Sequence, residues 1–214
     1  MYFQTLDDKT ECVGIYKDGK LHFSDIPADL KRTWRYGGDI GEDAEYAWLR
    51  CGGLSLEEVC PENILQQYKA SVQKMRAFHK SFIIAKIDFN EHCIYDLIPH
   101  DALVEFCDIK NQITKHVFDA YEEPSNYEFL VEASKLLHSI RHRGLNVDIS
   151  DCKSMFTSTI NRNSLRKIMD GSRYIDYNLF GTVTGRLTTN PGSFPILTMK
   201  KELRRILKPH NDWF

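Results

Sequence analysis

The sequence predicts an α+β protein in which a small β-rich region precedes a helical bundle and a polar, strand-containing carboxy-terminal segment. Three observations lead to this class. Residues 1–54 hold short apolar segments between turn residues, residues 55–150 repeat apolar side chains every three or four positions, and residues 151–214 are polar and basic with one alternating stretch. We therefore expect three regions with these boundaries, in a chain long enough for one ordinary domain or two small ones.

The first region is typical of antiparallel strands. The segments YFQTL and ECVGIY are separated by the turn residues DDKT, and the Asp-Gly pair at 18–19 before LHF predicts a tight hairpin. Further along, EYAWLRC at 45–51 predicts one more strand. We expect Trp34, Tyr46 and Trp48 to lie in the core.

The middle region predicts three helices. Ser55 and Glu58 fit a capping box, and helical spacing of the apolar residues follows over 62–86, from Pro99 to about Tyr121, and from Pro124 to Gly144. The third helix is expected to bury Tyr127, Leu130, Val131, Leu136, Leu137 and Ile140. After it, residues 148–167 are expected to form a polar surface link, and residues 174–183 alternate as a strand does.

Composition excludes several classes of protein. The chain is 42% apolar and 27% charged, as soluble globular proteins are, and no apolar run is long enough for a membrane span. The start lacks a secretory signal pattern. Six cysteines without a CxxC pair indicate reduced thiols in a cytoplasmic protein, without a zinc site or a disulfide framework. His138 and His142 lack a third ligand at matching spacing, so we expect no metal site in this sequence.

The charges are distributed unevenly along the chain. Residues 153–208 carry eleven Lys and Arg against three Asp and Glu, whereas residues 1–152 carry seventeen against twenty-six. A polyanion would therefore meet the carboxy-terminal segment rather than the protein as a whole.

The stretch GTVTGRLTT at 181–189 combines features suited to a nucleic-acid backbone. Its two glycines allow close approach, its threonines offer hydroxyl groups, and Arg186 offers a planar cation for phosphate. The basic stretch KKELRRILKP follows at 200–209. The residues that we expect to bind DNA are Thr184, Gly185, Arg186, Thr188, Arg204 and Arg205.

The order TGRLTT, NPGSFPILTM, KELRRILKP and HNDWF over 177–214 resembles the family A DNA polymerases, in their small phage-type form. A second stretch, YEEPSNYEFLVEASKLLHSIRHRGLNVD at 121–148, looks like a helix signature of the same family. The resemblance implies that the last region begins a polymerase thumb and palm, with a thumb much shorter than in classical members. It also leaves Asn190 as a candidate for the asparagine that members carry after this motif.

The resemblance implies a DNA-directed DNA polymerase, a nucleotidyltransferase of DNA replication, whose partners are primer–template DNA and dNTP. Its two Mg²⁺ ions are held by palm carboxylates, which by the family pattern would follow Phe214. We therefore expect no catalytic residue within residues 1–214, polymerisation only by the intact protein, and a location in the host cytoplasm. Arg186 would contact the duplex near the primer terminus, and either Arg204 or Arg205 could instead form a structural ion pair with the palm.

Two other classes of function remain open. One is a non-catalytic DNA-binding or accessory module, which the basic segment alone would support. The other is a 3′–5′ exonuclease-type domain in the first region, which in the family needs a D-x-E sequence on its first strand. Asp7, Asp8 and Glu11 have a different spacing, so a solvated turn is their expected role.

Overall fold

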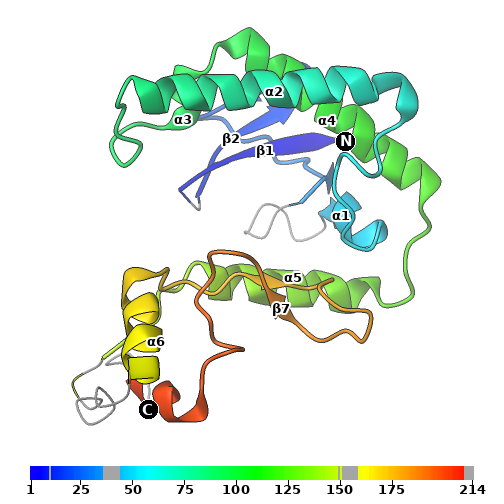
Figure 1. Ribbon diagram of the computed structural model, residues 1–214. Helices are drawn as coiled ribbons and strands as arrows, with labels where there is room; N and C mark the ends of the chain where they lie inside the picture. Colours follow the sequence, from blue (N-terminus) through cyan, green and yellow to red (C-terminus); the bar gives the residue numbers. More distant parts are fainter. Residues whose placement is uncertain (10, 36–43, 149, 151–158, 210–214) are drawn as a thin grey trace. The chain divides into compact units, whose positions relative to one another are not determined.

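The computed structural model describes residues 1–9, 11–35, 44–148, 150 and 159–209. The chain forms two compact units, unit 1 from Met1 to Val131 and unit 2 from Glu132 to Phe214. Helices and small sheets occur in the same chain, which confirms the predicted α+β class (Figure 1). The predicted regions 1–54, 55–150 and 151–214 differ from this division, because the amino-terminal strands and the first two long helices lie in one unit.

The three-stranded sheet of unit 1 is an antiparallel meander. Strands β1 (Phe3–Asp8), β2 (Glu11–Lys17) and β3 (Lys20–His22) follow one another in space as they do in sequence. Lys17 pairs with Lys20 across a two-residue loop whose Asp18 and Gly19 have φ of 49° and 79°. Two successive left-handed residues are what a tight hairpin turn requires, so the predicted hairpin is confirmed.

The segment 45–51 is mostly helical, and its prediction as a strand was wrong. Only Glu45–Tyr46 forms a strand, β5, which pairs in parallel with β4 (Arg32–Thr33). Helix α1 (Ala47–Arg50) follows at once and buries three consecutive residues, Ala47, Trp48 and Leu49. A half-buried strand would have turned every second side chain outward. The predicted burial of Tyr46 and Trp48 is confirmed, and Trp34 packs partly buried beside the same core.

Helices α2 (Glu62–Ile84) and α4 (His100–Ala120) confirm the first two predicted helices, with the short α3 (Ile94–Leu97) between them. Helix α4 packs against α2, α1 and β1 (Figure 1). Its central position explains its many buried residues, namely Ala102, Leu103, Cys107, Ile109, Ile113, Thr114 and Val117. The Ser55–Glu58 capping hydrogen bonds form, but they close a turn that precedes α2.

Helix α5 (Tyr127–Arg141) confirms the third predicted helix, and the division between the units falls within it. Its predicted buried face is wrong at Leu136, whose side chain is 62% exposed. Leu136 follows the buried Ser134 by two positions, which places it about 200° further around the helix.

Unit 2 has its own hydrophobic core. After the end of α5, unit 2 contains α6 (Thr159–Asp170), strands β6 (Tyr177–Asn178) and β7 (Thr188–Thr189), and the 3-10 helix η2 (Lys201–Ile206). Leu165, Ile168, Ile175, Phe194, Met199, Leu203 and Ile206 are buried together.

Two predictions for unit 2 were too coarse. Residues 159–167 belong to α6, and they are not a surface link, because Leu165 and Ile168 lie one turn apart and enter the core together. The predicted strand over 174–183 contracts to Tyr177–Asn178, after which the chain turns. Asp148 lies ahead of α6, and residues 151–158 are outside the described residues.

Candidate nucleic-acid interface

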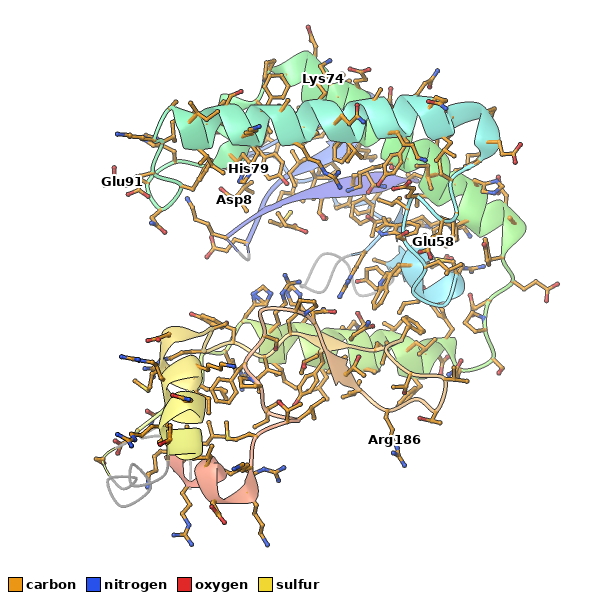
Figure 2. All side chains as sticks on the ribbon, in the orientation of Figure 1. Asp8, Glu58, Lys74, His79, Glu91 and Arg186 are labelled. Atoms are coloured by element: carbon orange, nitrogen blue, oxygen red, sulfur yellow. The ribbon has the colours of Figure 1, made fainter. Side chains whose placement is uncertain are left out.

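The motif GTVTGRLTT lies on the connection between β6 and β7, here called the β6–β7 loop (residues 179–187). The two strands pair in antiparallel fashion, with Tyr177 opposite Thr189 and Asn178 opposite Thr188. All residues from Gly181 to Leu187 are exposed. Figure 2 shows the Arg186 side chain extending from this loop.

Hydrogen bonds within the loop fix its tip. The Thr182 hydroxyl donates to the Arg186 carbonyl oxygen over 2.9 Å, and the Gly185 amide donates to the Thr182 carbonyl oxygen over 3.3 Å. Gly185 has φ of 71°, and an added Cβ there would meet no atom within 4 Å. A left-handed backbone, which favours glycine, thus turns the chain just before Arg186.

The second glycine of the motif serves a different purpose. A Cβ at Gly181 would lie 1.7 Å from the Thr188 hydroxyl oxygen, so the missing side chain lets the two arms of the loop close. The sequence predicts that both glycines admit an outside backbone. Gly181 instead admits Thr188 of its own chain, which leaves that threonine half-buried and assigns it to closing the loop.

The loop returns through a polar network at its base. The Asn190 amide N–H donates to the Asp176 carbonyl oxygen over 2.9 Å, and its side-chain NH₂ donates to the Asp176 carboxylate over 3.0 Å. Arg141 Nε lies 3.7 Å from the same carboxylate. Asn190 therefore holds the loop in place, and Asp176 and Arg141 are supporting residues that the sequence motif did not identify.

Among the described residues, no carboxylate lies within ion-pair distance of Arg186, Arg204 or Arg205. The guanidinium of Arg186 is thus available to a ligand. Arg204 and Arg205 are exposed on η2, while the flanking Leu203 and Ile206 are buried. The alternative role for Arg204 or Arg205, an ion pair with the palm, stays a prediction.

One core supports both basic elements. Tyr177 of β6 packs against the unit 2 core, to which η2 contributes Leu203 and Ile206. Unit 2 carries fourteen Lys and Arg against seven Asp and Glu, whereas unit 1 carries fourteen against twenty-three. The exposed arginines thus belong to the unit whose overall charge attracts a polyanion.

The carboxylates of the first region take part in local hydrogen bonds. The Asp8 carboxylate accepts the Ile94 amide over 3.2 Å, and the Asp7 carboxylate accepts the Thr5 hydroxyl over 3.1 Å. The first four residues of β1, Phe3 to Leu6, are buried on both faces of the strand, whereas Asp7 and Asp8 lie at its more exposed end. Among the described residues, no three His, Cys, Asp or Glu side chains gather as a metal site would require.

The rings of His138, in the last turn of α5, and His142, just after the helix, lie with centroids 4.0 Å apart and planes tilted by 44°. Comparison of the chain with protein-family models, curated proteins and solved structures found no match. Within the described ranges, no helix is both long enough and apolar enough to cross a lipid bilayer.

Proposed function

We propose that this chain is part of a DNA-directed DNA polymerase of family A and that unit 2 binds the backbone of primer–template DNA. The observation that carries this proposal is the β6–β7 loop, which holds an exposed Arg186 without a carboxylate partner in the described residues. The order of motifs over 177–214 supports the family, and the positive charge of unit 2 supports the partner.

The arrangement suits a phosphate better than a base-reading role. A guanidinium offers a fork of N–H donors that matches phosphate oxygens. The exposed Thr184 hydroxyl lies 3.4 Å from the Thr182 hydroxyl, to which it donates because Thr182 itself donates to the Arg186 carbonyl oxygen. Thr184 would donate to a phosphate by exchanging that hydrogen bond. Gly185 leaves open space on the same turn, so a backbone can come close. Arg204 and Arg205 would add phosphate contacts from η2.

In this proposal, the described residues position the duplex and other residues perform the chemistry. Two Mg²⁺ ions bound by palm carboxylates would activate the primer hydroxyl and hold the dNTP phosphates. The family pattern assigns those carboxylates to no position of residues 1–214, and the enzyme would act in the cytoplasm of a phage-infected cell.

The test is the Arg186→Ala variant, measured by fluorescence anisotropy with a labelled primer–template duplex at several NaCl concentrations. Removing one phosphate contact should make the slope of log K against log [NaCl] shallower by about 0.9 and weaken binding about fivefold to tenfold near 0.1 M salt. Unchanged affinity together with an unchanged slope would refute the proposed role of this loop.

Lys135→Ala is the matched control, because it also removes one cation from unit 2. Lys135 already pairs with Glu132 over 3.3 Å, so its loss should leave the slope nearly unchanged. A duplex without a primer terminus tests the alternative of an accessory module. Equal affinity for duplexes with and without a terminus would favour that alternative over a polymerase.

A further inference from the structure

Helix α2 is an exception within the acidic unit 1. After its first residue, Glu62, the helix carries no carboxylate, and residues 63–86 hold the cations Lys69, Lys74, Arg76, Lys80 and Lys86. The rest of unit 1 is strongly acidic, since the whole unit has fourteen cations against twenty-three carboxylates. Such a local reversal of charge gives this helix a positive potential that can attract a polyanion.

Three of these cations lie on one face of the helix. At about 100° per residue, Lys69, Arg76 and Lys80 lie about 140–180° around α2 from the buried Ser71. All three are exposed, as is Gln73 between them. We call this face the α2 stripe (Lys69, Gln73, Arg76 and Lys80). From Lys69 to Lys80 it runs for about 16 Å along the helix axis.

The stripe is only partly neutralised. Lys69 Nζ lies 3.2 Å from a Glu57 carboxylate oxygen. Arg76 and Lys80 form no ion pair among the described residues. Lys74 lies on a different side of the helix, about 60° from Ser71, and pairs with Glu105 over 2.9 Å. Figure 2 labels this paired lysine on α2.

The chemistry of the stripe fits a phosphate backbone. Gln73 can donate to phosphate oxygens, and the neighbouring Ala70 and Ala77 leave room for a close approach. Arg76 and Lys80 are one turn apart, with a rise of about 6 Å between them, so the two cations can reach successive phosphates of one strand. The stripe itself contains none of the Trp or Tyr anchors that dominate protein interfaces.

We propose that the α2 stripe is a second DNA-binding surface, located on unit 1 and separate from the β6–β7 loop. It binds the phosphodiester backbone without reading bases, because it offers only cations and one amide. The inference requires that the protein binds DNA, but it does not depend on Arg186 or on a polymerase reaction.

The test compares the wild-type chain with the double variant Arg76→Ala, Lys80→Ala. Binding is measured by anisotropy over a series of NaCl concentrations with three labelled probes, namely a single strand, a blunt duplex, and a duplex with a single-stranded template overhang. Losing two phosphate contacts should make the salt slope shallower by about 1.4 on single-stranded DNA or about 1.8 on duplex DNA. A change of about 1.4 on the single strand with none on the blunt duplex identifies a single-strand surface, and a change of about 1.8 on the blunt duplex with none on the single strand identifies a duplex surface.

The matched control removes two cations from unit 1 outside the stripe, in the variant Lys74→Ala, Lys115→Ala. Lys115 is exposed on α4. An equal change of slope in this control would mean that net charge alone matters, and the proposal would fail. The swap Arg76→Lys, Lys80→Arg should keep the wild-type slope. Circular dichroism and thermal unfolding should be the same for all variants, because the substituted side chains are exposed.

The experiments can refute DNA binding by the β6–β7 loop and DNA binding by the α2 stripe independently of each other. If Arg186→Ala leaves the slope unchanged while the stripe variant lowers it, the role of the β6–β7 loop is refuted and the stripe is supported. If the stripe variant matches the wild type on all three probes, the stripe is not a DNA surface. An acidic protein partner would then be the better explanation, with the exposed Ile83 and Ile84 at the end of α2 in its contact area.

Discussion

The phenol of Tyr127 joins the beginning of α5 to β5. Its hydroxyl oxygen accepts the Tyr46 amide N–H over 2.7 Å, and the side chain is 9% exposed. Burial disfavours the phenolate and raises the pKa of Tyr127 to about 12. This residue therefore combines a buried hydrogen bond with an ionisation that the fold suppresses.

We expect Tyr127→Phe to lower the free energy of unfolding by about 1–3 kcal/mol, because the buried Tyr46 N–H loses its acceptor. The measurement is urea unfolding at neutral pH. Tyr174→Phe is the control, since that ring is half-exposed and its change should be close to zero. Equal stability of both variants would contradict the assigned hydrogen bond.

The same substitution should also alter the response to alkaline pH. The unfolded chain ionises Tyr127 near its ordinary pKa of about 10, below its pKa of about 12 in the folded state. The stabilisation from the neutral phenol is therefore complete below pH 10 and is lost as the pH rises from about 10 to about 12. Because burial also raises the pKa of Tyr16 and Tyr95, the test is the difference between the wild type and the variant.

At the scale of elements, local signals were enough for the hairpin and the long helices. The Asp18-Gly19 turn and the apolar spacing of α2 and α4 depend on residues that are close in sequence. The secondary-structure predictions were wrong where contacts with distant parts of the chain determine the structure. Helix α1 forms in a segment with strand character because three successive side chains are buried, and α6 forms in a polar segment because two residues reach a core.

The candidate site, like the fold, was predicted correctly only where neighbouring residues determine the structure. The motif indicated two glycines and an arginine suited to a nucleic-acid backbone, without predicting the loop that carries them, and the structure describes Arg186 as exposed. The role of Gly181 was not predictable, because it depends on how the chain returns to Thr188 seven residues later. Binding of DNA by the whole predicted set stays a prediction, namely by Thr184, Gly185, Arg186, Thr188, Arg204 and Arg205.

Helix η2 separates the stabilising residues from the basic ones. Leu203 is 2% exposed and Ile206 is fully buried, while Arg204 and Arg205 face outward. We expect Leu203→Ala to lower the stability of unit 2 by about 2–5 kcal/mol through the lost contacts and the resulting cavity. Arg204→Ala should change stability by less than about 0.5 kcal/mol, as exposed substitutions usually do.

Chemical denaturation followed by circular dichroism measures both variants of η2. DNA binding by the same proteins separates the two kinds of residue, since Arg204→Ala should weaken binding without destabilising the fold. A strongly destabilised Arg204→Ala variant would show that this arginine is structural, as the alternative ion pair requires.

The whole chain divides its charge and its hydrophobic core in the same way. Unit 2 is basic with a core of its own, and unit 1 is acidic with cores built from the sheet and from α1, α2 and α4. The residues buried in the unit 2 core all come from unit 2. A defect in that core should therefore act locally.

We expect hydrogen exchange to show this separation. In Leu203→Ala, amides of α6 and η2 should exchange faster, whereas amides of α2, α4 and the β1–β2 pair should keep their wild-type rates. Ile113→Ala is the reciprocal control, because Ile113 is fully buried in unit 1. Faster exchange throughout the chain in both variants would mean that the two units unfold together.

The close approach of Gly181 to Thr188 also limits how this loop can change during evolution. Because a side chain at 181 would overlap Thr188, the residue types that fit at 181 depend on the residue at 188. Even alanine at 188 would leave a Cβ 2.8 Å from a Cβ at 181, so alanine at 181 requires glycine at 188 or a shift of the backbone. Gly185 is free of this dependence and can pass to asparagine or aspartate, which tolerate a left-handed backbone. A substitution at position 185 therefore needs no change elsewhere in the loop, whereas substitutions at 181 and 188 depend on each other.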